Sequence, residues 1–278
     1  AFGPATQPGR LYAGTIPGGL FVSDDGGDSW ELNRPLWNHE SRGGDLFKGE
    51  ATSTTHWGGT PASIDYGVFE PGIHSIVIDP RNADHLYVAV SSAGILETKN
   101  GGKTWVGRNK GMRVDYLPDP EAEWGHDPHF VTACRDQPDH VWQQNHFGVY
   151  YSDNGAQSWN KVSLPDAGVH FGFPIAVDAQ DGRTAWVVPA RADSERMALD
   201  GGLFVARTSD GGQSWQSFRS GLPQENAYDI VFRHGLDVAG DCVCFGSTTG
   251  NVYLSEDRGE HWHCLGNHFP PVYSVRFG

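Results

Sequence analysis

Four histidines beside predicted strands have the clearest potential for chemistry in this chain. His74, His129 and His170 stand near the starts of short β-rich runs, and His146 follows the end of another. Imidazole can donate or accept a proton near neutral pH and is a common metal ligand. The histidines therefore support two alternatives. One is acid–base catalysis by His129 and His146, and the other is a divalent metal site formed by His74, His129 and His146.

Carboxylates in long connecting segments offer a further route. Glycoside cleavage needs one protonated and one ionised carboxyl group. The candidates are Asp115, Asp127, Asp193 and Glu195. Asp127 and Glu195 are also candidates to act beside the histidines, as catalytic groups or further metal ligands. Spacing in the sequence does not show which two would form a pair.

Arginines in the same connections could hold an anionic group or stabilise a developing oxyanion. They lie in residues 111–128 and 189–202, where charged and aromatic residues are mixed. Long loops on a regular scaffold are usual places for binding sites. The predicted ligand-binding set is Arg113, Tyr116, Gln144, Asn145, His170, Arg191, Arg196 and Tyr273.

A repeated turn must position these side chains. One eight-residue pattern, Ser/Thr-x-Asp/Asn-x-Gly-x-x-Trp with Ala once replacing Gly, occurs five times. The Asp or Asn can accept backbone hydrogen bonds, Gly tolerates positive φ, and the Trp can bury its ring beside the turn. Each copy therefore predicts a hairpin corner with a structural role. The copies are Ser23–Trp30, Thr98–Trp105, Ser152–Trp159, Thr208–Trp215 and Ser255–Trp262.

Short β-rich runs precede each turn in a regular order. Predicted innermost strands are His74–Ile78, His129–Val131, Phe173–Val177 and Tyr228–Phe232, and each is followed by a second strand. Four-stranded units repeating about every 40–55 residues are typical of β-propellers. We expect an all-β, five-bladed β-propeller with four-stranded antiparallel blades.

The chain ends favour closure of the ring. The first repeat lacks an innermost strand, and residues 271–277 read as the missing one. N- and C-terminal strands would then share one blade, which removes an exposed sheet edge. We therefore expect residues 1–278 to form a single propeller domain, as a natural five-bladed form rather than a fragment of a longer propeller.

The turns resemble the Asp-box (BNR) repeat of sialidases, sortilin-type receptors, xyloglucanases and photosystem assembly propellers. More narrowly, four segments resemble the bacterial "BNR-repeat glycosyl hydrolase-like" proteins: Leu11–Trp30, Gln143–Gly155, Ala227–Val238 and Phe245–Trp262. The resemblance implies a propeller fold and leaves the reaction open. Sialidases carry an Arg-Ile-Pro motif before the first repeat, whereas here only Arg10 stands there, so sialidase activity is not expected.

An insertion at about residues 36–72 interrupts the first repeat. A binding site or a solvated surface loop would both fit its composition. Its polar and aromatic candidates are Trp37, His39, His56, Trp57, Asp65 and Tyr66.

Composition excludes several partners. Lys and Arg number 20 against 34 Asp and Glu, a net charge of −14, so nucleic acid and anionic membranes are not expected partners. Four cysteines are too few for a disulfide scaffold, which favours a cytoplasmic location, although secretion after signal removal stays open. Cys242, Cys244 and Cys264 match no familiar zinc spacing, and buried free thiols are favoured.

Two functions follow from these observations. The first is a hydrolase or lyase, acting on a small polar substrate that is carbohydrate-like or carries a carboxylate, at a pocket on the propeller axis. Its cofactor would be a divalent metal or none. The alternative is a non-catalytic propeller that binds a ligand or protein through one face or its loops. An enzyme should gather titratable groups in a pocket, whereas a binding module should expose an aromatic patch.

Overall fold

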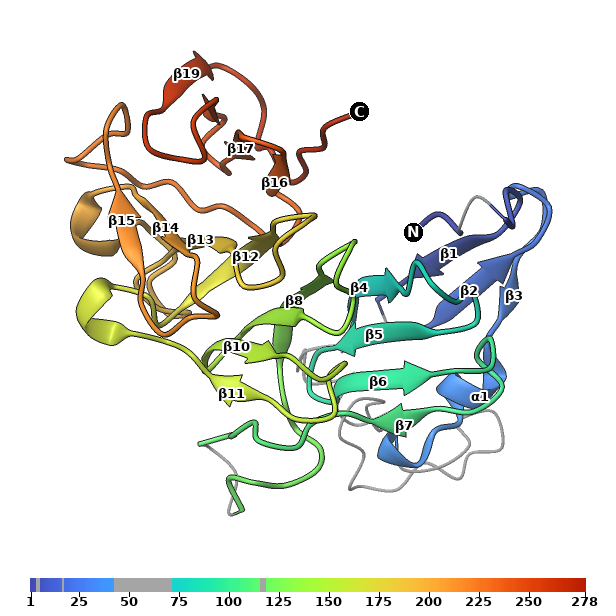
Figure 1. Cartoon of the computed structure of the whole chain (residues 1–278). Helices are drawn as coiled ribbons and strands as arrows, with labels where there is room; N and C mark the ends of the chain where they lie inside the picture. Colours follow the sequence, from blue (N-terminus) through green and yellow to red (C-terminus); the bar gives the residue numbers. More distant parts are fainter. Residues whose placement is uncertain (4–5, 17, 43–71, 116–118) are drawn as a thin grey trace. The chain divides into compact units, whose positions relative to one another are not determined.

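A computed structural model describes residues 1–3, 6–16, 18–42, 72–115 and 119–278 of the chain (Figure 1). The chain separates into two compact units, Ala1–Val131 and Thr132–Gly278. The boundary falls within strand β8 (Pro128–Ala133). Within the described residues the strands form five sheets of consecutive strands, four with four strands and one with three.

The first unit contains the three-stranded sheet β1-β2-β3 and the four-stranded sheet β4-β5-β6-β7, both paired antiparallel. A short helix α1 (Arg34–Trp37) and a 3-10 turn (Glu40–Arg42) follow β3. The strands are β1 (Leu11–Gly14), β2 (Leu20–Ser23), β3 (Glu31–Leu32), β4 (Ile73–Ile78), β5 (Leu86–Val90), β6 (Gly94–Thr98) and β7 (Val106–Gly107).

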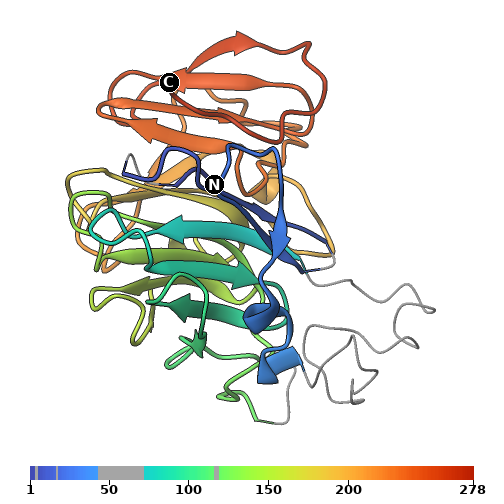
Figure 2. The same ribbon diagram turned by 90° about the vertical axis from the view of Figure 1, so that its right-hand side faces the viewer.

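Three sheets involve the second unit: β8 to β11, β12 to β15, and β16 to β19. The last of these, in orange and red, can be followed in Figure 2. Their strands, after β8, are β9 (Val141–Asn145), β10 (Gly148–Ser152), β11 (Asn160–Lys161), β12 (Gly172–Val177), β13 (Ala185–Pro189), β14 (Val205–Thr208), β15 (Gln216–Phe218), β16 (Leu236–Ala239), β17 (Cys242–Gly246), β18 (Val252–Ser255) and β19 (His263–Gly266). Two 3-10 turns, Pro165–Ala167 and Leu199–Gly201, lie in the connections.

The five repeated turns form the predicted hairpin corners. In the third copy, the Ser152 hydroxyl accepts from the backbone N–H of Ala156 at 3.0 Å and donates to Asn154 at 2.8 Å. Asn154 in turn accepts from the backbone N–H of Ser158 at 3.1 Å. The other four copies repeat this arrangement. The local chemistry predicted for the repeat is therefore confirmed.

The tryptophan that ends each turn is buried in four of the five copies. Trp105, Trp159, Trp215 and Trp262 are buried, whereas Trp30 keeps 42% of its surface exposed. Trp30 still donates its indole N–H to the Gly27 carbonyl oxygen, so its turn is closed in the usual way.

Six of the described strands are buried along their whole length. Every residue of β5, β6, β9, β10, β12 and β13 is buried, as expected for strands covered on both faces. In the first unit the core gathers around Leu20, Val88 and Leu96, and in the second around Trp186, Val243 and Phe245.

Two strand predictions need correction. Tyr228–Phe232 is not a strand, and β16 occupies the inner position of its sheet instead. Residues 271–277 do not join the first sheet. Their backbone pairs within the second unit, where Val275 N–H donates to the His234 carbonyl at 2.9 Å and Val272 N–H to Ser247 at 3.0 Å. These backbone hydrogen bonds tie residues 271–277 to the second unit, and the sheet β1-β2-β3 has three strands.

The fold class is confirmed, since these sheets are the blades of a five-bladed β-propeller. The expected single domain and the natural five-bladed length stay predictions. Most of the insertion, residues 43–71, lies outside the described residues, and with it His56, Trp57, Asp65 and Tyr66. None of the helices in the described part of the chain has the length and hydropathy needed to cross a membrane.

Candidate functional site

A pocket of about 330 Å³ lies in the second unit, where the β9–β10 turn meets the segments before β12 and after β13. Small-molecule sites typically occupy about 300–1,000 Å³, so the volume suits a small ligand. Its lining residues are His146, Phe147, Lys161, Ser163, Pro165, His170, Phe171, Arg191, Ala192 and Asp193.

His146 and its aromatic neighbours form the apolar part of this pocket. His146 follows β9 in a tight turn, and its ring centroid lies 5.0 Å from that of Phe147 and 5.9 Å from that of Phe171. Phe171 in turn meets Phe173 edge to face at 5.4 Å. The imidazole is therefore placed among aromatic rings rather than in bulk solvent.

His170 joins the two segments that flank the pocket. Its Nε2 lies 3.1 Å from the carbonyl oxygen of Arg191. A carbonyl only accepts, so Nε2 carries the hydrogen and neutral His170 has its lone pair on Nδ1. Nδ1 is buried and has no hydrogen-bond partner among the described residues. The bond to Arg191 thus fixes both the ring and its tautomer.

Two ion pairs shape the loop after β13. Arg191 lies 3.1 Å from Glu195, and Arg196 lies 2.6 Å from Asp193. All four side chains are substantially exposed, between 37% and 53%. The Arg196 guanidinium also stands 5.2 Å from the centre of the Phe173 ring. The loop therefore presents two arginines and two carboxylates at the pocket and its margin.

Sequence reasoning found part of this pocket. The structure brings together the predicted His146, His170 and Arg191, with Asp193 beside them. Lys161, Phe147 and Phe171 were missed. Phe147 and Phe171 each follow a predicted histidine directly, which is the signal that could have found them. Lys161 belongs to the outermost strand, and no sequence signal indicates its approach.

Gln144 and Asn145 serve the β9–β10 turn in the structure. Both are buried. The Gln144 amide donates to the carbonyls of Asn145 and Gly148, and Asn145 accepts from the backbone N–H of Phe147. Their hydrogen bonds hold the turn that carries His146.

Other predicted residues of the second unit lie outside the pocket lining. Tyr273 is 59% exposed and stacks on Phe232 at 6.0 Å. Glu195 and Arg196 meet the pocket only through their ion pairs with Arg191 and Asp193.

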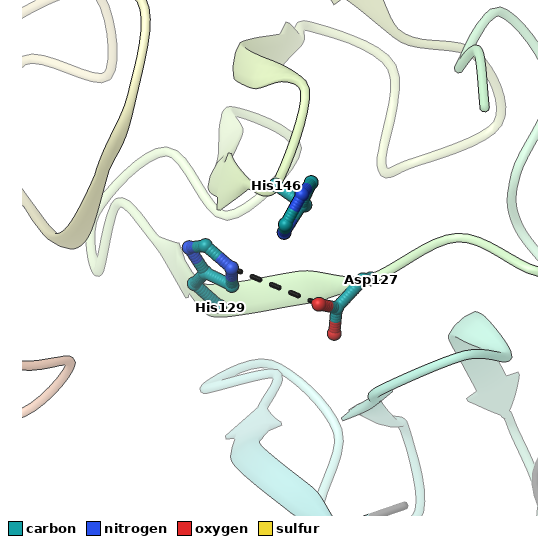
Figure 3. Close-up of side chains that lie close together, drawn as sticks. All are labelled: Asp127, His129 and His146. Atoms are coloured by element: carbon teal, nitrogen blue, oxygen red, sulfur yellow. Dashed lines mark ion pairs between the residues drawn. The ribbon is translucent and has the colours of Figure 1, made fainter. Parts of the chain in front are cut away.

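In the first unit, Asp127 and His129 form a pair at the start of β8. Oδ2 of Asp127 lies 3.7 Å from Nε2 of His129, and His129 is buried (Figure 3). His74 is half-buried in β4. Arg113 faces Glu121 at 3.4 Å and Asp115 at 3.8 Å, whereas Tyr116 lies outside the described residues. The metal set of His74, His129 and His146 draws on both units and stays a prediction.

The expectation of buried thiols holds for Cys134 and Cys244 but not for Cys264, which is exposed, or for Cys242, which is partly buried. Cys244 is buried opposite Leu254, and Cys264 is exposed opposite Tyr253. Burial, with a smaller contribution from the charge of Asp237, raises the pKa of the Cys244 thiol to about 11.

Five sheets with repeated Ser-Asp-Gly-Trp turns make this chain a β-propeller whose turns are similar to the Asp-box repeat. A family model, described as the BNR/Asp-box repeat, matches residues 21–32. That match covers the first turn, most of β2 before it and all of β3 after it.

Among characterised proteins, the chain is similar to an oligoxyloglucan-reducing end-specific xyloglucanase of Emericella nidulans. They are 24% identical over 255 residues, which are 91% of this chain and 25% of the relative. The chain thus spans about a quarter of the length of that relative.

Two solved structures share the fold. The GH74 xyloglucanase from Xanthomonas campestris superposes with a TM-score of 0.55 and 15% identity, over 92% of this chain and 36% of that one. The structure of YCF48 bound to D1 peptide gives a TM-score of 0.52 and 13% identity, over 92% of this chain and 64% of that one.

Proposed function

We propose that this chain is a carbohydrate-active hydrolase, or the part of one, that binds a sugar residue in the His146 pocket. The observation that carries the proposal is the lining of the pocket. Aromatic rings of Phe147 and Phe171 stand beside His146, Arg191 and Asp193. Ligand sites combine apolar and aromatic walls with a few polar groups that fix orientation.

Hydrolysis of a glycosidic bond needs a proton donor and a group that activates or replaces water. In the pocket, His146 would donate or accept the proton and the carboxylate of Asp193 would activate water. Arg191 would hold the ligand through its guanidinium, with His170 keeping the adjacent backbone in place. Metal assistance through His74, His129 and His146 is a separate proposal.

Similarity to the xyloglucanases supports a carbohydrate ligand. Both the Emericella nidulans protein and the Xanthomonas campestris structure are named for action on xyloglucan. The chain spans only part of each, so the substrate of the whole protein is itself part of the proposal.

The test is incubation of the chain with a panel of neutral and acidic oligosaccharides, xyloglucan-derived ones included, with products followed by mass spectrometry. We expect cleavage by the native chain and at least a hundredfold loss in His146→Ala and Asp193→Asn. His263→Ala, an exposed histidine on β19, is the matched control and should keep full activity. Absence of both cleavage and binding across the panel would overturn the proposal.

A peptide-binding propeller is the second candidate, favoured by the likeness to YCF48 bound to a peptide. Its surface would include Tyr228 and Tyr273, which are 62% and 59% exposed. Loss of peptide binding in Tyr273→Ala, with the His146 variant unaffected, would favour it over the hydrolase.

A further inference from the structure

The charges around the His146 pocket indicate what kind of sugar it takes. We infer that the ligand is an acidic sugar, carrying a carboxylate of the uronic-acid type, which Lys161 and Arg191 bind. This inference rests on the proposed function, because it names the ligand class of the same pocket.

The charged side chains at the pocket carry a net positive charge. The lining contains Lys161, Arg191 and Asp193 as charged residues. Asp193 is matched by Arg196 at 2.6 Å, and Arg191 by Glu195 at 3.1 Å. Lys161 remains, since no carboxylate of the described residues lies within ion-pair distance of it. In a chain of net charge −14, a pocket with excess positive charge is locally distinct.

Arg191 can be shared with an incoming anion. Its pair with Glu195 is exposed at both ends, 48% and 53%, and such surface pairs contribute little. A ligand carboxylate could therefore replace Glu195 at the guanidinium without a large loss. The planar guanidinium suits two parallel hydrogen bonds to a carboxylate, and the flexible Lys161 ammonium would add a second cation.

Positive charge continues beyond the pocket wall. Phe171, which lines the pocket, contacts Phe173 at 5.4 Å. The guanidinium groups of Arg196 and Arg233 lie 5.2 Å and 5.6 Å from the centre of the Phe173 ring. Arg196 is already counted against Asp193, so the preference for an anionic ligand depends on Lys161 and Arg191 in the lining itself.

Trigalacturonate and its fully methyl-esterified form test the inference, because esterification removes each carboxylate charge and adds only a methyl group in its place. Binding is measured by calorimetry with the full chain at low and moderate salt. We expect the acid to bind at least tenfold more tightly than the ester, with the difference shrinking as salt rises. Lys161→Gln should remove most of the preference, whereas Lys110→Gln, an exposed lysine of the first unit, should leave it intact.

The outcomes separate this inference from the proposed function. Equal binding of acid and ester, or an unchanged ratio in Lys161→Gln, would overturn the acidic-sugar inference while the hydrolase stands. Binding of neutral oligosaccharides alone would also overturn the acidic-sugar inference and leave the hydrolase proposal standing. If no oligosaccharide binds at all, both the proposed function and the acidic-sugar inference fail.

Discussion

Nε2 of His85 lies 2.7 Å from Oε1 of Glu97. On the other side of the ring, Nδ1 of His85 lies 2.9 Å from Oδ2 of Asp79. Both ring nitrogens of His85 therefore face carboxylate oxygens. Arg108 and Arg81 complete the row by bonding Glu97 and Asp79 at 2.6 Å and 2.7 Å. These five side chains form one polar network that links the β4–β5 connection, β6 and the residue after β7, and both of its carboxylates are buried.

Glu97→Gln should weaken the network around His85 and change how the stability of the protein depends on pH in acid. Burial opposes ionisation of Glu97, but hydrogen bonds from His85 and Arg108 outweigh it and lower its pKa from 4.5 to about 2. A lowered carboxyl pKa stabilises the folded state above the unfolded pKa, and the contribution is lost as pH falls through the folded value. We expect Glu97→Gln to lose about 3 kcal/mol of unfolding free energy at pH 7.

Urea denaturation at several pH values checks this prediction. Native protein should lose stability between about pH 5 and pH 2, and Glu97→Gln should do so less steeply. Glu256→Gln, which is exposed, is the control. A slope in Glu97→Gln equal to that of the native protein would contradict the prediction.

Arg258 provides the second prediction, because it stands at a position where the other four turns have glycine. Its φ of 63° is left-handed, where four other copies have glycine at the same position. Its guanidinium pairs with Asp178 at 2.8 Å and lies 5.3 Å from the centre of Trp186. Contacts between the last two sheets thus offset the backbone strain.

Substitutions at Arg258 separate the two effects. Arg258→Gly loses the contacts but relieves the strain, whereas Arg258→Ala loses the contacts and keeps it. We expect stability to fall in the order native, glycine, alanine, with about 1 kcal/mol between the two variants. Thermal and urea unfolding would measure it. A glycine variant more stable than the native protein would show that the contacts contribute little.

His126 gives a third prediction, near neutral pH. Burial lowers the pKa of His126, and the hydrogen bond from its Nε2 to the Ala122 carbonyl oxygen opposes this only in part. The unfolded chain then binds the proton more readily, so stability falls as pH drops below the ordinary histidine pKa of 6.5. His126→Gln should reduce the loss of stability between pH 7.5 and pH 5.5, measured by urea denaturation. His268→Gln, an exposed histidine, should leave that loss unchanged.

Thiol labelling gives the fourth prediction. Cys264 is exposed, while burial raises the pKa of Cys134 and that of Cys244, the latter to about 11. At pH 8 an aromatic disulfide reagent should label Cys264 first and leave Cys134 and Cys244 for the unfolded protein. Cys264→Ser should remove the fast phase. Rapid labelling of Cys244 would contradict the burial described here.

Prediction from sequence worked where the determinants are local. Turn chemistry is contained in eight residues, so Ser152, Asn154 and Ala156 could be assigned before the fold was known. It failed for Tyr228–Phe232, whose β-rich composition is outweighed by the pairing of β16 with β17. In the pocket, His170 and Arg191 were identified by their places at strand ends. Lys161 was missed because its approach depends on how far a long side chain reaches.

The hydrogen bonds that each turn makes within its own eight residues have an evolutionary consequence. Since Ser152 and Asn154 complete their bonds within their own eight residues, a copied blade brings its own corner with it. Duplication of a blade then copies these corner bonds as well, whereas contacts between neighbouring sheets, such as that of Arg258 with Asp178, depend on the next blade. The two solved structures that share the fold are only 13% and 15% identical to this chain, so the architecture persists while most of the sequence differs.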